Sequence, residues 1–500
     1  MLDLLLQGIS SLFTITGLSC LLGGVFVGII FGSVPGLSAT MALALFLPIT
    51  YALDSNMAVI LLIALYIGGI SGGLITAILT GIPGTPSSIA TCFDGYPMTK
   101  RNQAFKALGV GVTFSFLGTI FSTIVLIFLS PILAKIAIKF GAYEYFAVAL
   151  FSLSMLVGLS GDNIWKGLIS GLMGCMFATV GMDSIASVNR FTFGSEEIAY
   201  GFDVLPVLIG LFAINEIITK ADTVKSERQN AQVLSAIRME NGLGFSIKEF
   251  FGQIKNFLVS ASLGTGIGIL PGIGGGAANV MAYTVSKSTS KYPEKYGTGI
   301  MDGVVASEAS NNAAIGGALV PLLALGIPGD TVTAILLGGL TLHGIIPGPL
   351  MFTENVTTVY AIFTAMLFGS IVMFLMEFYG LRIFTKILAI PKHFLLPAIF
   401  LFCIIGAFGV RNNFFDVWAT VLFGVIGFSF YKLSIPAAPF ILGFIIGPLA
   451  EVNLRRGLMF SQGDFTEFFK APIATTFFIL TAFVIIFAIR TQMKKSRQSN

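Results

Sequence analysis

The chain has 500 residues, of which 55% are hydrophobic and only 10% are charged, and its mean hydropathy is +0.92. Soluble domains carry about 25% charged residues, so this composition excludes a soluble protein and predicts an integral membrane protein. The net charge of +4 is ordinary for that class. The apolar runs are too long and too uniform for the alternating strands of a β-barrel.

Long apolar segments recur along the whole chain. A membrane-spanning helix needs about 20 apolar residues, which gives roughly ten to twelve segments here, some of them re-entrant. The sequence therefore predicts an all-α polytopic membrane protein. The clearest segments are Gly17–Phe31, Met57–Thr80, Phe114–Leu129, Tyr143–Leu159, Val204–Ile218, Val356–Met376, Leu395–Gly409, Phe414–Phe430 and Pro472–Ile489. The basic tail that begins at Arg490 predicts a cytoplasmic C-terminus.

Four Pro-Gly pairs interrupt the apolar segments, two in each half of the chain. They are Pro35-Gly36 and Pro83-Gly84 in the first half, and Pro271-Gly272 and Pro328-Gly329 in the second. Proline has no N–H to donate and glycine adopts dihedral angles that other residues avoid, so each pair predicts a broken helix. In lipid the freed backbone groups need partners. Matched breaks in two halves indicate the binding site of a secondary transporter.

The two halves repeat one pattern with identical spacing. Gly28, Gly32, Pro35 and Gly36 recur as Gly264, Gly268, Pro271 and Gly272, and a Gly-Ile-Pro-Gly sequence follows in each half. These correspondences predict an internal duplication in the form of two inverted repeats. The predicted division is residues 1–219 for the first repeat half, 220–256 for a polar connection, 257–430 for the second repeat half, and 431–500 for C-terminal membrane segments and the basic tail.

The breaks also predict where a small organic anion binds. Helix starts carry unpaired N–H groups and partial positive charge, so two of them can hold a carboxylate without a buried cation. Indeed, no Lys or Arg occurs in residues 68–90 or 303–342. The predicted substrate-binding residues are Ser71, Gly84, Thr85, Ser87, Ser88, Gly329, Asp330, Thr331 and Thr333. The alternative for the hydroxyl residues is that they cap helices or join helices within the membrane.

A coupling-cation site is predicted beside the second pair of breaks. Unwound carbonyl groups together with Ser310, Asn311 and Asn312 resemble an oxygen-rich sodium site more than a proton relay, and Asp330 is a further candidate ligand. Glu308 has two interpretations, an acid on an ion path at membrane depth or a helix-start carboxylate near the interface. Sodium is therefore the expected coupling ion, and no other cofactor is expected.

The residues of several motifs and their order along the chain resemble those of a known family, the large membrane subunit (TctA) of the tripartite tricarboxylate transporters. The motifs are Gly81-Ile-Pro-Gly-Thr-Pro86, Asp94-Gly-Tyr-Pro-Met98, Pro271-Gly-Ile-Gly-Gly275, Glu308-Ala-Ser-Asn-Asn312, Gly326-Ile-Pro-Gly329 and His343-Gly-Ile-Ile-Pro-Gly-Pro349. The resemblance covers about residues 17–430. One position departs from it, since Asp330 stands where the family more often has a small hydroxyl residue. A carboxylate there repels an anion unless it is protonated or paired with a cation.

The resemblance implies a permease of the prokaryotic cytoplasmic membrane that takes up organic anions such as citrate, driven by a cation gradient. It also implies two partners, a small membrane subunit and an extracytoplasmic solute-binding protein. Lipid surrounds such a protein, a homodimer is compatible with it, and no nucleic-acid partner is expected.

Two other classes of function were weighed against transport by a carrier. A channel also uses broken helices for its filter, but the chain has no repeated filter motif and no ring of charges. An enzyme is not expected, because the two histidines, His343 and His393, lie in no hydrolase or metal-ligand motif. The cysteines Cys20, Cys92, Cys175 and Cys403 are scattered singly, which predicts neither a metal site nor a disulfide framework.

Overall fold

The computed structural model describes residues 8–155, 163–221, 243–387 and 392–498. The chain is 79% helical and has one hairpin of two-residue strands in the described part. Seven helices among the described residues are long and apolar enough to cross a membrane. The prediction of an all-α membrane protein is therefore confirmed, while the number of ten to twelve segments stays a prediction.

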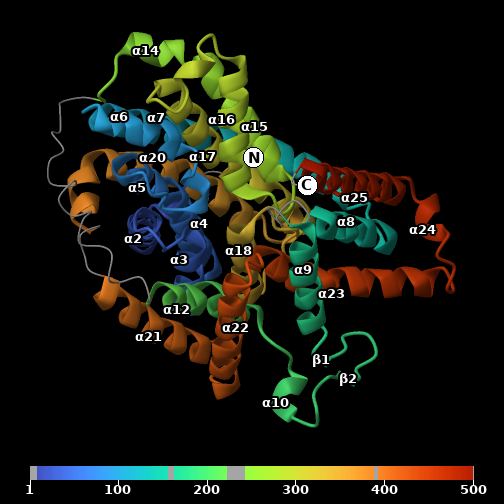
Figure 1. The fold of residues 1–500 in the computed structure, drawn as a ribbon. Coiled ribbons are helices and arrows are strands. Elements are labelled where there is room, and N and C mark those ends of the chain that lie inside the picture. The colour runs from blue at the N-terminus through green and yellow to red at the C-terminus, as the bar shows by residue number, and fades with distance from the viewer. Residues whose placement is uncertain (1–7, 156–162, 222–242, 388–391, 499–500) are drawn as a thin grey trace. The chain divides into compact units, whose positions relative to one another are not determined.

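Chain contacts divide the molecule into two compact units (Figure 1). The first unit comprises Met1–Leu133 and Glu216–Gly406, and the second comprises Ala134–Asn215 and Ala407–Asn500. All the predicted substrate and cation residues lie in the first unit. The predicted four-part division of the sequence stays a prediction, and residues 222–242 of its polar connection lie outside the described residues.

The helices of the first unit follow the breaks seen in the sequence. They are α2 (Ile15–Ser33), α3 (Ala39–Phe46), η1 (Leu47–Ala52), α4 (Ser55–Ser71), α5 (Gly73–Thr80), η2 (Pro86–Ser88), α6 (Thr91–Lys100), α7 (Ala104–Ala137), α12 (Asn215–Ala221), α14 (Ile247–Gly252), α15 (Ile254–Ile269), α16 (Gly274–Thr289), η6 (Pro293–Lys295), α17 (Met301–Leu325), α18 (Thr331–Leu342), α19 (Met351–Glu354), α20 (Val356–Ile387) and α21 (Lys392–Arg411). Helices α7, α12 and α21 run across a boundary between the units.

Two helix pairs form the centre of the first unit, α2 with α4 and α15 with α17. Each pair packs through glycines that leave no room for a side chain. A β-carbon at Gly28 would lie 2.6 Å from the carbonyl oxygen of Leu65, and one at Gly268 would lie 2.6 Å from that of Ala314. Small residues allow membrane helices to approach this closely because lipid supplies little hydrophobic force between helices. The equivalent glycines of the two halves therefore allow the same close contact between helices.

This packing makes Gly268 intolerant of even one added carbon. Gly268→Ala should lower the stability of the purified protein by about 1–3 kcal/mol, because the nearest atoms are backbone and cannot move aside easily. Gly266→Ala is the matched control on the same helix, since a β-carbon there meets nothing within 4 Å. Thermal unfolding in detergent measures both, and equal midpoints for the two variants would contradict this account of the packing.

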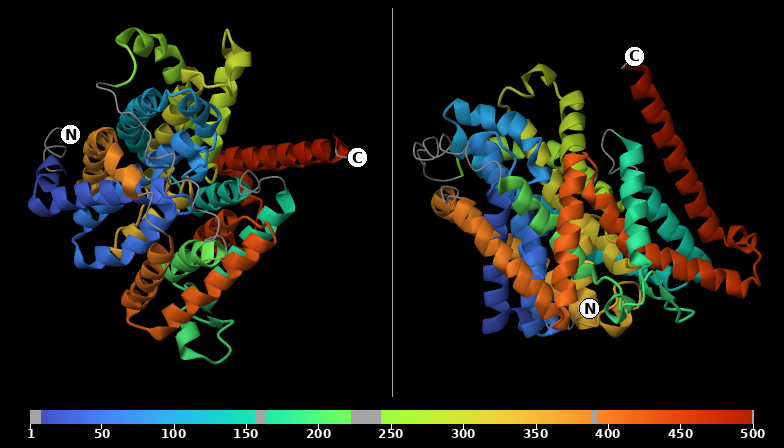
Figure 2. Two further views of the ribbon diagram at one scale, coloured as in Figure 1. Left: turned by 60° about the vertical axis from the view of Figure 1, so that its left-hand side comes forward. Right: turned by 60° about the horizontal axis from the view of Figure 1, so that its bottom comes forward.

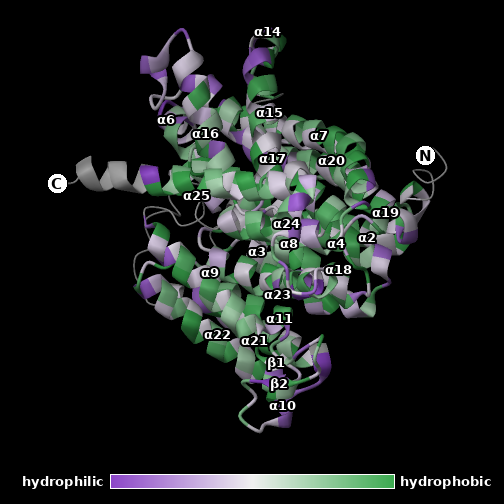
Figure 3. Cartoon of the chain, turned by 90° about the vertical axis from the view of Figure 1, so that its right-hand side faces the viewer, coloured by the Kyte–Doolittle hydropathy of each residue, from purple (hydrophilic) through white to green (hydrophobic). Residues whose placement is uncertain are grey.

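Polar contacts fix the segments that leave the helix pairs. Helix α14 is attached to α7 by the ion pair of Glu249 with Lys106. The Lys106 ammonium and the backbone N–H of Ser246 lower the pKa of the Glu249 carboxyl to about 2. Hydrophilic residues gather in such connections, for example around α14, while the long helices are mainly hydrophobic (Figure 3).

The second unit is a separate bundle of helices with one hairpin (Figures 1 and 2). Its elements are α8 (Ala142–Ser154), α9 (Ile164–Ala178), β1 (Gly181–Met182), β2 (Asn189–Arg190), α10 (Glu196–Ala199), α11 (Val204–Leu208), the π-helix η4 (Ile209–Ile214), α22 (Phe414–Lys432), α23 (Ala437–Phe460), α24 (Glu467–Lys470) and α25 (Pro472–Gln498). Glycines again mediate close contacts, since a β-carbon at Gly174 of α9 or at Gly210 of η4 would collide with α23 and α22 respectively.

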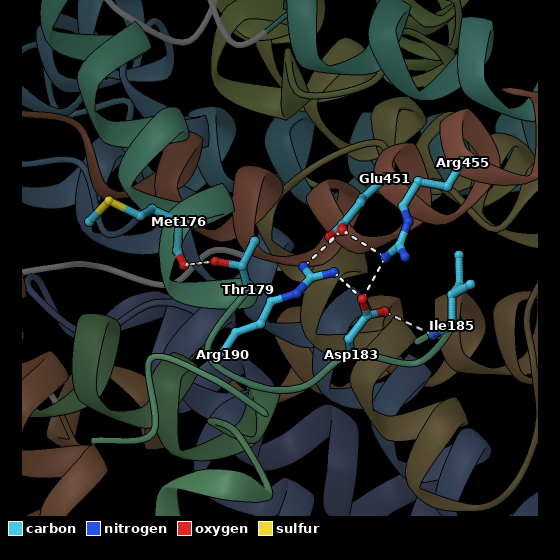
Figure 4. A network of polar contacts seen from close by, with 7 residues as sticks. All are labelled: Met176, Thr179, Asp183, Ile185, Arg190, Glu451 and Arg455. Carbon is cyan, nitrogen blue, oxygen red and sulfur yellow. Dashed lines mark hydrogen bonds and ion pairs between the residues drawn. The ribbon is translucent and has the colours of Figure 1, made fainter. Parts of the chain in front are cut away.

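An ion network attaches the β1–β2 hairpin to α23 within this unit (Figure 4). Asp183 pairs with Arg190 and with Arg455, the latter at 2.6 Å, and Glu451 completes the network 2.8 Å from Arg190. The backbone N–H of Ile185 and the Arg455 guanidinium hold the pKa of the Asp183 carboxyl well below its usual range. The network holds the hairpin against α23, because the carboxylates of Asp183 and Glu451 pair with the guanidinium groups of Arg190 and Arg455.

Candidate functional site

The two Gly-Ile-Pro-Gly sequences form matching turns at the ends of helices. Helix α5 ends at Thr80 and α17 ends at Leu325, and the next residue in each case, Gly81 or Gly326, has φ +72°. Left-handed backbone of this kind is favourable only for glycine. The local sequence thus sets the same helix stop in both halves.

Each turn leads into a new helical segment with its own cap. Asp330 caps α18, because the backbone N–H of Thr333 donates to Asp330 Oδ1 at 2.7 Å and the Asp330 N–H donates to Thr333 Oγ1 at 2.8 Å. In the first half the N–H of Thr85 donates to Ser88 Oγ at 3.3 Å. Capping, the alternative weighed for these hydroxyl residues, therefore occurs at Ser88 and Thr333. A role of either in substrate binding stays a prediction.

The last glycine of each turn approaches another part of the backbone. A β-carbon at Gly84 would collide with the carbonyl oxygen of Gly32, and one at Gly329 would lie 2.7 Å from that of Gly268. The N–H of Gly272 also donates to the carbonyl of Gly329 at 2.8 Å. In each half, the glycine that ends the Gly-Ile-Pro-Gly turn therefore lets this turn approach the end of the helix that precedes the first Pro-Gly pair.

The turn of the first half meets helices of the second half. The backbone N–H of Ala90 donates to Asn279 Oδ1 at 2.7 Å, and Asn279 Nδ2 donates to the carbonyl of Ser307 at 3.1 Å. Gly275 lies between Asn311 and Ser87, since a β-carbon there would be 3.0 Å from Asn311 Oδ1 and 3.4 Å from Ser87 Oγ. Residues more than 180 positions apart in the sequence therefore line one place.

The turn of the second half meets helices of the first half in a corresponding way. Tyr66 of α4 donates its hydroxyl to Asp330 Oδ2 at 2.6 Å, and the hydroxyls of Thr40 and Thr331 lie 3.4 Å apart. Both carboxylate oxygens of Asp330 therefore accept hydrogen bonds. Asp330, the residue that departs from the family pattern, thus has hydrogen-bond partners for both of its carboxylate oxygens.

At the turn of the first half, the corresponding polar side chains lack hydrogen-bond partners. When the two Gly-Ile-Pro-Gly turns are aligned, Tyr66 corresponds to Asn311 and Asp330 corresponds to Thr85. The side chains of Asn311 and Thr85 have no hydrogen-bond partner. In the described part of the chain, the buried side-chain atoms without one are Thr76 Oγ1, Thr85 Oγ1, Asn311 Nδ2, Asn311 Oδ1, Asn312 Oδ1 and Glu377 Oε1. An unpaired buried polar group costs about 1–3 kcal/mol, and more than 90% of such groups in native structures are paired. The unpaired atoms of Asn311 and Thr85 therefore make this place a candidate ligand site.

Helix α16 adds backbone donors to the same place. It begins at Gly274 in the sequence Gly274-Gly275-Gly276, and no side chain caps its first turn. Three glycines leave the N–H groups open to a ligand, and the helix start adds partial positive charge. The equivalent helix α3, by contrast, is capped by Ser38, whose hydroxyl accepts from the N–H of Met41 at 3.1 Å.

The predicted cation residues are only partly brought together. Ser310 donates its hydroxyl to the carbonyls of Ala306 and Ser307, so it is bonded within its own helix. Asn311 Oδ1 and Asn312 Oδ1 are buried acceptors without donors, which suits a hard cation. Asp330 has its hydrogen bonds with Tyr66 and Thr333 rather than with these residues. Of the predicted cation ligands, Asn311 and Asn312 are therefore the ones that keep an unpaired side-chain oxygen, and the cation site stays a prediction.

Two of the fully buried acids of the first unit, Glu308 and Glu377, lie on the long helices α17 and α20. Glu308 is in the third turn of α17, which excludes a helix start at the interface, and it accepts hydrogen bonds from Thr91 and, at 2.9 Å, from Ser115. The predicted substrate residue Ser71 instead donates to Glu377 of α20 at 2.9 Å. Sequence reasoning missed Glu377, although it is the single acid in the apolar segment of α20.

Asp94 in the first turn of α6 and His343 at the C-terminal end of α18 fix segments that follow the two turns. Asp94 is buried, and its Oδ1 accepts the backbone N–H groups of Gly297, Gly299 and Ile300 at 2.7–3.0 Å while Oδ2 accepts the hydroxyl of Tyr283 at 2.8 Å. One carboxylate thus fixes a loop of the other half. His343 Nε2 lies 3.1 Å from Thr50 Oγ1, a contact that joins the end of α18 to η1.

Broken membrane helices that surround unpaired polar groups define a membrane transport protein. The chain belongs to the tripartite tricarboxylate transporter TctA family, whose model matches residues 18–442. Two similar proteins come from Agrobacterium vitis. An uncharacterized 52.8 kDa protein in the TAR-I ttuC' 3' region is 34% identical over 475 residues, which are 95% of this chain and 93% of that protein. An uncharacterized protein in the TAR-II ttuC' 3' region is 36% identical over 234 residues, 47% of this chain and 97% of that protein. No solved structure matches significantly.

The two asparagines on either side of this place should respond oppositely to truncation. Asn279→Ala should lower the free energy of unfolding by about 1–3 kcal/mol, because it leaves the buried N–H of Ala90 without its acceptor and removes one donor to the carbonyl of Ser307. Asn311→Ala should leave stability unchanged or raise it, because its amide has no partner to lose. Denaturation of the two purified variants compares them, and a destabilised Asn311→Ala variant would argue for a purely structural asparagine.

Proposed function

We propose that the chain is the large permease subunit of a tripartite uptake system, a secondary active transporter that carries a small organic anion into the cell. A cation gradient drives it, and a small membrane subunit and an extracytoplasmic solute-binding protein work with it in the cytoplasmic membrane. The C-terminus lies in the cytoplasm. Family membership supports the class, and the open polar site supports a bound solute.

The observation that carries the proposal is the uncapped start of α16 beside Ser87 and Asn311, with the unpaired Thr85 two residues before Ser87 in the same turn. An anion needs donors, and these residues supply two hydroxyls, one amide and the free N–H groups of a helix start. The sequence places no Lys or Arg in residues 68–90 or 303–342. Binding without a fixed positive charge keeps the anion weakly enough held to be released on the other side.

The same place offers acceptors for a coupling cation. Asn311 Oδ1 and Asn312 Oδ1 are free, and Asn312 Nδ2 donates to the Glu308 carbonyl at 3.2 Å, which orients its amide. Asparagine oxygens bind hard cations such as sodium. A cation beside a carboxylate substrate strengthens the binding of both, which is the thermodynamic basis of symport.

Removing donors should weaken substrate binding. In proteoliposomes that contain the chain, its small subunit and its binding protein, Thr85→Ala should raise the half-saturating concentration of labelled citrate at least about tenfold, because a hydrogen bond to a charged group contributes about 1.5–3 kcal/mol. Thr284→Ala on the exposed face of α16 is the control, since its hydroxyl only bonds to the Val280 carbonyl. Unaltered citrate uptake by Thr85→Ala would remove this turn from the site, and uptake that never saturates would indicate a channel.

The cation site makes a separate prediction. Asn312→Ala should raise the half-saturating sodium concentration more than it raises that of citrate at saturating sodium, because it removes a cation ligand and leaves the anion donors in place. Ser429→Ala, at an exposed hydroxyl of α22, serves as the control. Citrate uptake that ignores sodium in the wild type and follows the pH gradient would transfer the coupling to protons.

A further inference from the structure

Glu377 is a buried acid whose charge nothing in the described structure balances. It lies on α20 and is 0% exposed. Its Oε2 accepts the hydroxyl of Ser71 at 2.9 Å, and its Oε1 has no partner. No described Lys or Arg forms an ion pair with it. A carboxylate buried at membrane depth without a cation is costly, so such groups are found neutral or with a bound ion.

Among the side chains that the structure describes, the titratable groups around Glu377 offer no positive charge to its carboxylate. Helix α2 carries Cys20 and α4 carries Tyr66, whose hydroxyl is bonded to Asp330. Helix α7, whose Phe116 ring contacts that of Phe374 on α20, carries Lys106, paired with Glu249, and Lys135 in its last turn. Helix α19 carries the exposed Glu354. Glu308 of α17 interacts electrostatically with Glu377 and has the same sign.

The carboxyl group contacts the helix junction that leads to the site. Ser71 is the last residue of α4, and α5 begins two residues later at Gly73. A β-carbon at Gly73 would lie 2.5 Å from Thr85 Oγ1 and 3.0 Å from Ser88 Oγ, so the junction packs directly against the first turn. A displacement of Ser71 therefore moves Gly73, two residues later, which packs against Thr85 and Ser88 of the candidate site.

This acid–hydroxyl contact belongs to one half alone. Ser71 corresponds to Gly316 in the second half, and Gly316 packs against Ser122 of α7, with a β-carbon 2.6 Å from its hydroxyl. The packing of two helices at the equivalent point thus involves no acid, so a buried carboxyl group is not a requirement of the shared framework.

We propose that Glu377 is a proton-binding site that links protonation to the position of the α4–α5 junction. When Oε1 carries a proton from water, the neutral acid still accepts the Ser71 hydroxyl at Oε2 and the junction stays against α20. When the proton returns to water, the carboxylate cannot remain unsolvated, and the junction separates from α20 and admits water. The inference rests on the proposed function and adds a proton to its coupling ions.

Infrared difference spectroscopy of the purified full-length chain tests the proton site without any substrate. The wild type should show the carbonyl band of a protonated carboxylic acid near neutral pH, and Glu377→Gln should lose that component. Glu354→Gln, which removes an exposed acid close to the start of α20, should leave the band intact. Ser71→Ala should retain the band but change its frequency, because the hydrogen bond to the acid is gone. A spectrum of Glu377→Gln identical to that of the wild type overturns the proposal.

Transport measurements test the coupling. Glutamine imitates the protonated acid but cannot release a proton, so Glu377→Gln proteoliposomes should exchange internal for external labelled citrate yet lose net uptake driven by a pH gradient. Net uptake equal to that of the wild type overturns the coupling. If the wild type moves no citrate at all, the proposed substrate class fails, while the infrared result still decides whether Glu377 binds a proton.

Discussion

The need to satisfy backbone groups at broken helices inside a membrane constrains the first unit more than any other requirement. Lipid offers no hydrogen bonds, so every interrupted helix must find partners in protein, water or a ligand. Here the breaks pair with one another: Gly84 lies against the carbonyl of Gly32, and Gly329 against that of Gly268. The N–H of Gly272 completes one pair by donating to Gly329. Because backbone groups contact one another at the breaks, the buried polar side chains that still lack partners are the candidates for contact with a ligand.

The two halves solve this constraint with one framework and different chemistry. Glycines at equivalent positions pack the helices and form the turns, yet Tyr66 bonds to Asp330 in one place whereas Asn311 and Thr85 are unpaired in the other. A closed contact stiffens its turn, and an open one costs stability that a bound solute can return. The division of labour is consistent with a duplicated ancestor, and the inverted relation of the halves stays a prediction.

Local chemistry determined which parts could be predicted from the sequence. Glycine and proline act on their own backbone, so the interruptions at Pro35, Pro83, Pro271 and Pro328 coincide with ends of helices in the structure. Asn311 and Thr85 are candidates from the sequence because they adjoin these breaks, and their roles stay predictions. Tyr66 and Thr76 are not recognisable from the sequence because each lies within an apolar helix, and its neighbours come from remote segments. The hydroxyl of Ser71, a predicted substrate residue, donates to Glu377, a contact that no local pattern reveals.

The lengths of the segments beside the breaks have a consequence for biogenesis. Helices α3 and α5 have 8 residues each and α18 has 12, so at 1.5 Å per residue they extend only about 12–18 Å. A bilayer core is about 30 Å thick, so the insertion machinery cannot release them singly into lipid as stable spans. Helix α5 avoids this difficulty because it continues α4, and the two together form an apolar stretch of 26 residues. Helices α3 and α18 have no such extension, so their place at membrane depth depends on the protein that surrounds them, and a folding defect in their neighbours would expose their ends to lipid.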